Sequence, residues 1–143
     1  MGPLDNYLPY LLNRAGARIA TAFGEEMRRL GASLQSWRVL AALREKDGRR
    51  MGDLSLTTSI EVSTLTRLVD TMENKGLVAR RRDANDTRAV LLHVTAAGRR
   101  LTRRILPIAE RYEDVALQGF GPAEAAVLKA NLRRLYANMA DLA

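Results

Sequence analysis

The sequence predicts a mainly α-helical protein with one small β-hairpin, arranged as a helix-turn-helix followed by a wing. Three observations support this fold class. Apolar residues recur at helical spacing over most of the chain, β-forming residues cluster within residues 77–94, and surplus positive charge gathers around that cluster. With 143 residues, the chain is expected to form one domain over residues 1–143.

The charge distribution favours a polyanionic partner. The chain has 23 Lys and Arg against 16 Asp and Glu, a net charge of +7 with its one histidine neutral. Eight arginines lie between Arg80 and Arg104, against two acidic residues, so this stretch carries +6. Guanidinium groups bind phosphates and guanine edges in bidentate geometry, which makes nucleic acid the first candidate.

The composition also excludes several classes of site. Cysteine is absent, which excludes disulfides, thiolate nucleophiles and Cys-ligated metals, and one histidine cannot build a multi-histidine site. We find no catalytic constellation around His93, no phosphate-binding glycine loop and no sign of a cofactor, so we expect a protein that is not an enzyme. No apolar run reaches the ~20 residues of a membrane span, and no secretory signal is evident, which predicts a cytoplasmic protein.

The N-terminal part predicts three helices. Periodic apolar residues indicate a first helix over Tyr7–Leu30, with Asn6 as its N-cap and Gly31 at its end. Ser33 is expected to cap a second helix that stops at Asp47-Gly48. A short third helix is expected over residues 51–57, followed by a break of small polar residues.

The next helix, from about Glu61 to Asn74, has two different faces. Leu65, Leu68, Val69 and Met72 follow the i, i+3, i+4, i+7 pattern of a buried stripe. At about 100° per residue, the opposite face carries polar residues. They are Ser63, Arg67, Asp70 and Asn74, with Thr64 and Thr66 on the flanks. Because the carboxylate of Asp70 would repel phosphate, we expect it to pair with an arginine.

A hairpin and two further helices complete the chain. Residues 77–82 and 88–94 read as strands joined by the turn-forming residues 83–87. Thr95 is expected to cap a long helix that reaches about Gln118 and contains Pro107. The last helix starts at Pro122 and carries a heptad-like apolar seam of Leu128, Leu132, Leu135, Met139 and Leu142, which needs a partner to bury it.

This order of elements predicts a way to read DNA. A helix with an apolar back and a small, polar, arginine-bearing front fits the major groove, and a hairpin tip can reach the adjacent minor groove. We therefore expect Ser63, Thr64, Thr66 and Arg67 in the major groove and Arg88 in the minor groove. Arg80, Arg81 and Arg82 are expected to neutralise phosphates.

At these residues the chain resembles the MarR family of winged-helix transcription regulators. The resemblance runs through Gln35–Leu40, Ser63–Asp70, Glu73–Val78, Asp83–Arg88 and Leu92–Gly98, including the wing signature Asp86-Thr87-Arg88. Through this signature the resemblance implies that Asp86, like Arg88, belongs to the DNA-binding site. It departs at Leu54–Thr58, where a more alanine-rich helix is usual. The resemblance implies a winged helix-turn-helix over 33–98, flanked by dimerisation helices over 1–30 and 100–143. It also implies a homodimer that binds an inverted repeat.

The resemblance further implies a ligand-responsive repressor with a small anionic aromatic effector, or a CoA thioester of such an acid. Aromatic rings beside guanidinium groups suit this ligand chemistry. The candidates are Tyr7, Tyr10, Asn13, Arg14, Arg18, Trp37, Arg38, Arg111 and Tyr112. Packing in the core or at a dimer interface is the alternative for the aromatic residues.

Two other functions are compatible with a basic helical protein. A helical protein–protein adaptor would use the wing to bind an acidic partner, and would not prefer an inverted repeat over random DNA. A ligand-binding or enzymatic helical dimer would bind or convert a small molecule without binding DNA. The ordered helix-turn-helix and wing favour the DNA-binding regulator over both.

Overall fold

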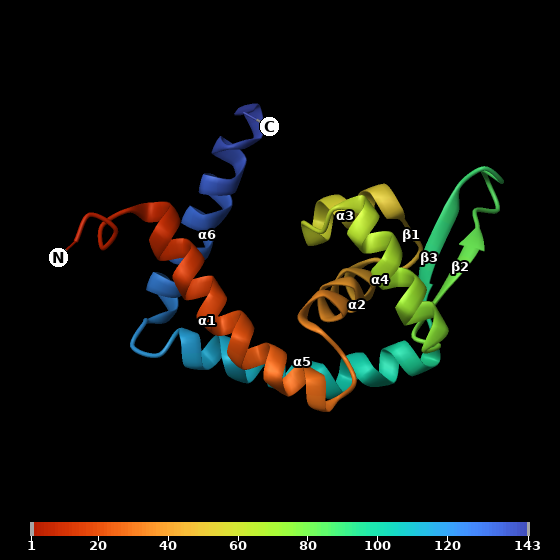
Figure 1. The fold of residues 1–143 in the computed structure, drawn as a ribbon, viewed down its shortest axis with the longest axis horizontal. Coiled ribbons are helices and arrows are strands. Elements are labelled where there is room, and N and C mark those ends of the chain that lie inside the picture. The colour runs from red at the N-terminus through yellow and green to blue at the C-terminus, as the bar shows by residue number, and fades with distance from the viewer. Residues whose placement is uncertain (1, 143) are drawn as a thin grey trace. The chain divides into compact units, whose positions relative to one another are not determined.

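The computed structural model describes residues 2–142 and confirms a mainly helical fold with a small sheet (Figure 1). The chain divides into two compact units between Ala109 and Glu110, and α5 contributes to both. In chain order the elements are α1 (Leu8–Arg29), α2 (Leu34–Glu45), β1 (Arg49–Arg50), α3 (Met51–Thr58), α4 (Val62–Asn74), β2 (Val78–Arg82), β3 (Val90–Val94), α5 (Ala96–Ala116), α6 (Pro122–Asn138) and the 3-10 helix η1 (Ala140–Leu142).

The sheet of the first unit has three antiparallel strands in the order β1-β3-β2. The predicted hairpin is confirmed, with Val78 opposite Val94 and Arg82 opposite Val90. Strand β1 adds an edge to it, with Arg49 opposite Leu92. This edge strand was not predicted, because two residues carry no detectable alternation and the pairing is made with a strand more than 40 residues further along the chain.

The core of the first unit gathers apolar side chains from every helix and from the two long strands. The predicted stripe of α4 faces it, since Leu65 and Val69 are fully buried and Met72 is 2% exposed. The other buried apolar residues are Phe23, Met27, Val39, Leu40, Ala42, Leu43, Leu54, Ile60, Val78, Leu92, Leu101 and Ile105. Helix α4 is thereby fixed by its back, and its polar face is left exposed.

Local capping signals set most helix ends. Ser33 caps α2, accepting the backbone N–H of Ser36 at 3.1 Å, and Gly31 and Gly76 end α1 and α4 with φ near +70°. Thr95 caps α5 by accepting the Gly98 N–H at 3.0 Å. The prediction of Asn6 as an N-cap is wrong: α1 begins after Tyr7, without a side-chain cap and with Pro9 in its first turn.

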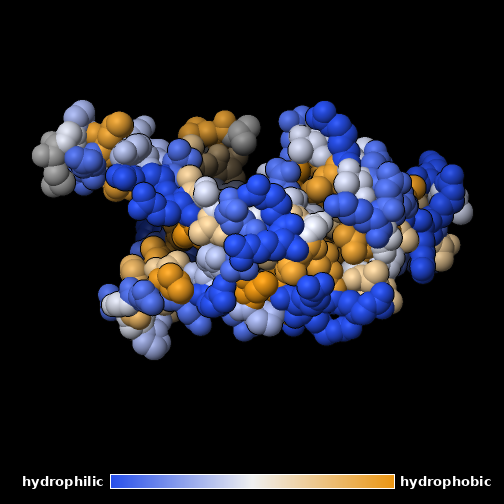
Figure 2. All heavy atoms as spheres, turned by 60° about the horizontal axis from the view of Figure 1, so that its bottom comes forward, coloured by the Kyte–Doolittle hydropathy of each residue, from blue (hydrophilic) through white to orange (hydrophobic). Residues whose placement is uncertain are grey.

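The second unit contains the end of α5, helix α6 and η1. Lys129 on α6 forms an ion pair with Glu113 on α5, with 2.9 Å between Nζ and Oε1. No residue of α6 is buried in the single chain. Four residues of the predicted seam therefore stay exposed, from 37% at Leu128 to 78% at Leu142, and Leu135 is half-buried. Figure 2 shows hydrophobic residues reaching the surface among hydrophilic ones. No helix within residues 2–142 is both long and apolar enough to span a membrane.

Gly98 permits a close approach between the first turn of α5 and the start of the wing. A Cβ atom at this position would lie 2.2 Å from the Leu77 carbonyl oxygen and 2.7 Å from Val94 Cγ2. We predict that Gly98→Ala lowers the free energy of unfolding by about 1–3 kcal/mol in urea titrations, because backbone must move to admit the methyl group. Gly52→Ala is the control, since no atom lies within 4 Å of a Cβ there. Equal stability of the two variants would contradict this prediction.

Candidate nucleic-acid interface

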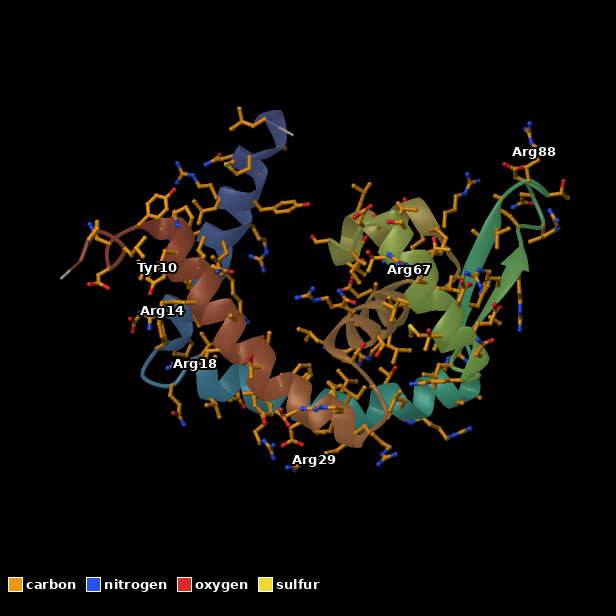
Figure 3. The ribbon with its side chains drawn as sticks, in the orientation of Figure 1. Tyr10, Arg14, Arg18, Arg29, Arg67 and Arg88 are labelled. Atoms are coloured by element: carbon orange, nitrogen blue, oxygen red, sulfur yellow. The ribbon has the colours of Figure 1, made fainter. Side chains whose placement is uncertain are left out.

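The exposed face of α4 and the wing of strands β2 and β3 lie in the same unit and form the basic surface predicted from the sequence. Ser63, Thr66 and Arg67 are exposed on α4, and Thr64 is half-buried beside them. Figure 3 shows Arg67 on α4 and Arg88 at the far end of the wing. The helix presents short side chains around one long cation, which lets its backbone approach a DNA groove closely.

Two hydroxyl groups of this face are already hydrogen-bonded within the protein. Ser63 Oγ donates to Glu61 Oε1 at 2.8 Å, and Thr66 Oγ1 donates to the Val62 carbonyl oxygen at 2.8 Å. Each hydroxyl proton is thus engaged, while the oxygen can still accept a hydrogen bond. In this arrangement both residues suit a donor such as a base amino group better than a phosphate oxygen.

Arg80 on β2 connects the wing to α4. Its Nη1 lies 2.7 Å from Glu73 Oε1 and its Nη2 lies 2.7 Å from Asp70 Oδ1, while its backbone N–H donates to Glu73 Oε2 at 3.0 Å. The backbone and side-chain hydrogen bonds from Arg80 lower the pKa of Glu73. Burial opposes the charge on Arg80, but hydrogen bonds to Asp70 and Glu73 outweigh it and raise the pKa of the guanidinium. The expected pairing of Asp70 with an arginine is confirmed.

This geometry changes the role that we expect for Arg80. Its side chain is 28% exposed and its two terminal nitrogens are bound to carboxylates of α4. With both nitrogens engaged, we now expect Arg80 to position the wing against the helix rather than to neutralise phosphate. Arg81 and Arg82, by contrast, are exposed. Arg82 also donates from Nη1 to the Thr87 carbonyl oxygen at 2.6 Å, which closes the hairpin beneath its tip.

Two aspartates shape the tip of the wing. Asp83 Oδ1 accepts the Asn85 N–H at 3.0 Å, and Asp86 Oδ1 accepts the Arg88 N–H at 3.1 Å, the pattern of Asx turns. Asp86 thus orients the backbone of Arg88, whose side chain is 95% exposed. The Asp86-Thr87-Arg88 signature therefore has a structural explanation. The aspartate stabilises the turn of the loop, and the arginine projects from it.

Arg50 belongs to this surface although the sequence did not single it out. From β1 its Nη2 lies 3.7 Å from Asp86 Oδ2 and 3.9 Å from Asp83 Oδ2. It therefore offsets the negative charge of both loop carboxylates. The only available signal was the adjacent pair Arg49-Arg50, which does not indicate a strand.

Some of the candidate ligand residues lie together on α1. Asn13, Arg14 and Arg18 line a shallow hollow along one side of α1, and the Arg14 guanidinium lies 5.4 Å from the Tyr10 ring centroid (Figure 3). Trp37 instead contacts the buried Phe23 ring edge-on at 6.5 Å between centroids. Trp37 is half-buried, and this ring contact favours packing as its role.

Tyr7 and Arg38 also belong to the first unit, where they are exposed and do not line this hollow. Arg111 lies in the second unit, 5.4 Å from the ring centroid of its neighbour Tyr112. Within the first unit, Tyr10, Asn13, Arg14 and Arg18 are the predicted ligand residues that share one surface.

Comparison with known proteins identifies the family. The model of the MarR family matches residues 30–89, which run from the turn before α2 to the tip of the wing. A MarR-family transcriptional regulator from Silicibacter pomeroyi is 36% identical, with a TM-score of 0.85 over 95% of this chain and 92% of that one. The chain belongs to the MarR family. As in that family, it is a DNA-binding transcriptional regulator.

Further MarR-type relatives agree with this assignment. The transcriptional repressor CouR, solved bound to a 23-mer DNA duplex, is 27% identical with a TM-score of 0.85 over 95% of this chain and 96% of that one. BpsR of Bordetella bronchiseptica, whose DNA binding is regulated by 6-hydroxynicotinic acid, is 27% identical with a TM-score of 0.81 over 90% and 98%. The regulator YsmB of Bacillus subtilis is 29% identical over 62% of this chain, a match that spans 61% of its own length. The matched relatives are transcriptional regulators, not enzymes.

The different surroundings of Arg80 and Arg81 predict different salt dependence. We expect Arg81→Gln to lower the slope of log affinity against log salt by about 1 per bound copy on a random-sequence duplex, because a phosphate contact is lost. Arg80→Gln should weaken binding with little change in slope, because Asp70 and Glu73 lose their partner while no phosphate contact disappears. Equal flattening of the slope by both variants would show that Arg80 contacts phosphate directly.

The lowered pKa of Glu73 predicts an acid-sensitive contribution to stability. A carboxylate whose pKa is depressed on folding stabilises the native state fully above its unfolded pKa, near 4.5, and loses that contribution as pH falls through the lower native value. The Glu73→Gln variant should therefore lose less stability than the parent protein as pH falls below about 4.5. Urea titrations at several pH values measure this difference, and parallel curves for the two proteins would contradict it.

Proposed function

We propose that this MarR-family protein is a homodimeric repressor of inverted-repeat operators and that a small aromatic acid, or its CoA thioester, relieves repression. The observation that carries the DNA-binding part is the connection between α4 and the wing. Arg80 fixes the helix that bears Arg67 to the hairpin that bears the fully projecting Arg88. Two recognition elements in fixed geometry suit adjacent grooves of one duplex.

In this proposal each DNA contact has a distinct chemistry. Ser63, Thr64, Thr66 and Arg67 face base edges in the major groove, and Arg88 enters the minor groove, where narrow A·T segments attract arginine. Arg81 and Arg82 neutralise phosphates. Asp86 stays within the protein and sets the direction of Arg88, as its hydrogen bond to the Arg88 N–H supports.

The exposed apolar residues support a dimer. Leu128, Leu132 and Met139 leave a seam of α6 uncovered in the single chain, and Leu8 and Leu11 do the same on α1. We propose that residues 1–30 and 100–143 supply the dimerisation helices, with residues 33–98 as the DNA-binding region of a single domain. Two-fold symmetry would then place the two copies of α4 on half-sites about 34–36 Å apart.

The effector is proposed from chemistry and from a relative. The hollow along α1 offers Arg14 and Arg18 for an anion and Tyr10 for a ring. The regulation of BpsR by 6-hydroxynicotinic acid supports an aromatic acid as the ligand class. Binding would shift the population toward a spacing of the two α4 helices that no longer matches the half-sites.

Selection of bound sites from random duplex DNA tests this function. We expect an inverted repeat whose half-site centres are about one helical turn apart. An adaptor for an acidic protein would enrich no repeat, and a single unrepeated motif would contradict the dimer.

Substitution of Arg88 tests the wing contact on the selected site. We expect Arg88→Ala to weaken binding by about 1–3 kcal/mol in a gel-shift titration, because a groove contact and a cation are lost. Arg29→Ala is the matched control, since it removes the same charge from the last turn of α1, far from the wing (Figure 3). If both variants bind equally well, Arg88 makes no specific contact.

A further inference from the structure

Helix α4 begins with an apolar residue, Val62, that is 50% exposed. Polar side chains follow it on the exposed face of the helix. Single apolar residues are common on protein surfaces, so the exposure of Val62 alone says little and its position is what matters. In helix-turn-helix proteins, the N-terminal residues of the recognition helix contact base edges in the major groove. Val62 is the first residue of that helix.

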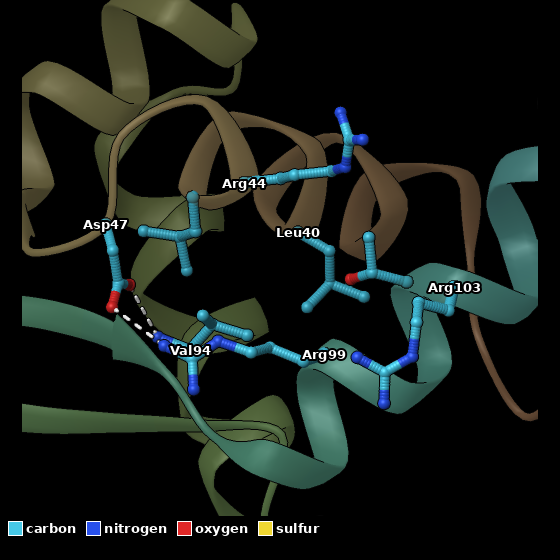
Figure 4. Close-up of a pocket in the computed structure, with 8 residues that line it drawn as sticks. Leu40, Arg44, Asp47, Val94, Arg99 and Arg103 are labelled. Carbon is cyan, nitrogen blue, oxygen red and sulfur yellow. Dashed lines mark hydrogen bonds and ion pairs between the residues drawn. The ribbon is translucent and has the colours of Figure 1, made fainter.

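The start of α4 is packed against the core by residues other than Val62. Ile60 and Leu65 take the two positions of a hydrophobic staple, one before the N-cap and one in the first turn, and both are buried. Val62 precedes the buried stripe by one turn and lies past its edge. It lines neither the hollow along α1 nor the pocket between α2, β3 and α5 (Figure 4). The exposed half of its side chain is therefore available to a partner.

The charge at this end of α4 favours base edges over phosphates. The N-cap residue, Glu61, is exposed, and its Oε1 accepts the Ser63 hydroxyl at 2.8 Å. A carboxylate beside Val62 repels a phosphate, whereas the base edges in the major groove are uncharged. The first turn of α4 therefore suits the floor of the groove rather than its walls.

The side chain of Val62 matches one group in that groove. Each base presents hydrogen-bonding atoms there, but only thymine adds a methyl group, at C5. Valine can neither donate nor accept a hydrogen bond, so its favourable contact is with this methyl group. Thr66 lies on the same side of α4, four residues later, and its hydroxyl donates to the Val62 carbonyl oxygen at 2.8 Å. The Thr66 methyl group extends the apolar surface that Val62 begins.

We propose that Val62 makes α4 selective for thymine, by packing its methyl groups against the C5-methyl group of one thymine in each half-site. Helical side chains tilt toward the N-terminus of their helix, so Val62 extends past the start of α4 toward the groove floor. Ser63 and Arg67 then contact the polar edges of neighbouring bases. This inference rests on the proposed function, because it requires α4 to lie in the major groove.

Replacement of thymine by uracil tests the contact, because uracil lacks the C5-methyl group and keeps the same hydrogen-bonding atoms. In the duplex recovered by site selection, each thymine is replaced in turn, and affinity for the full-length protein is measured in gel-shift titrations. We expect uracil at one position to weaken binding about 4-fold per half-site, the factor that corresponds to burial of one methyl group.

Variants of the protein assign the methyl contact to a side chain. With Val62→Ala, the thymine and uracil duplexes should bind within about 1.5-fold of each other, as in a double-mutant cycle whose interaction is lost. Alanine favours helix more than valine does, so α4 should still form. Val62→Ile keeps a branched apolar side chain and should retain a preference of at least about 3-fold.

Leu56→Ala is the matched control. Leu56 is another exposed apolar residue of the same helix-turn-helix, 75% exposed on α3 and about 200° around that helix from the buried Leu54. Its removal should leave the preference for thymine at about 4-fold. Loss of the preference in Leu56→Ala would assign the methyl group to α3 and overturn the proposal.

Other contrary results also overturn it. The proposal fails if uracil weakens binding less than about 2-fold at every thymine, if the selected half-site holds no thymine, or if the preference survives in Val62→Ala. The proposed function is judged separately, from the selected sequence itself. An inverted repeat without a thymine effect leaves that function standing and overturns only the role of Val62. A single unrepeated motif contradicts the dimer, and the uracil series is then measured on that motif; selection of no motif overturns both.

Discussion

The contacts of Arg80 with Asp70 and Glu73 determine how the DNA-binding surface is put together. Helix α4 is held by its buried apolar back, and the hairpin by its strand pairing and by the start of α5. The Leu77 N–H donates to the Met72 carbonyl oxygen and so joins the two at the turn between them. Arg80 joins them again further along, with three hydrogen bonds to two carboxylates. Since these groups are partly exposed, water screens their contribution to stability, and their main effect is on orientation.

The same contacts also neutralise a negative charge on the DNA-binding surface. The carboxylate of Asp70, on the outer face of α4, would repel a phosphate backbone, and its ion pair with Arg80 offsets that charge. Arg50 has the same effect on the aspartates of the wing loop. Acidic residues can thus shape a surface for a polyanion, provided that each has a cation beside it. The exposed cations Arg67, Arg81 and Arg88 then determine the outward charge.

Features with local causes could be predicted from the sequence, and features that depend on distant pairing could not. The caps at Ser33 and Thr95 and the buried stripe of α4 follow from residues within a turn or two of each other. The sequence predicted that Asp70 would pair with an arginine. It did not show which arginine, because that depends on how the hairpin packs against α4. Strand β1 exists only because β3, which pairs with it from more than 40 residues further along the chain, lies beside it. Asn6 had the right side chain for a cap, yet the helix began one residue later.

The hydrogen bonds inside the wing loop also reduce the conformational entropy that the loop would lose on binding DNA. A loop of this length without internal bonds would sample many conformations and would lose that freedom on entering a groove. Here Asp83, Asp86 and Arg82 already hold backbone groups of residues 85–88 in place before any duplex arrives. The loop is preorganised, and most of its ordering cost is met when the chain folds. In the proposed complex, Arg88 would therefore lose little more than the freedom of its own side chain.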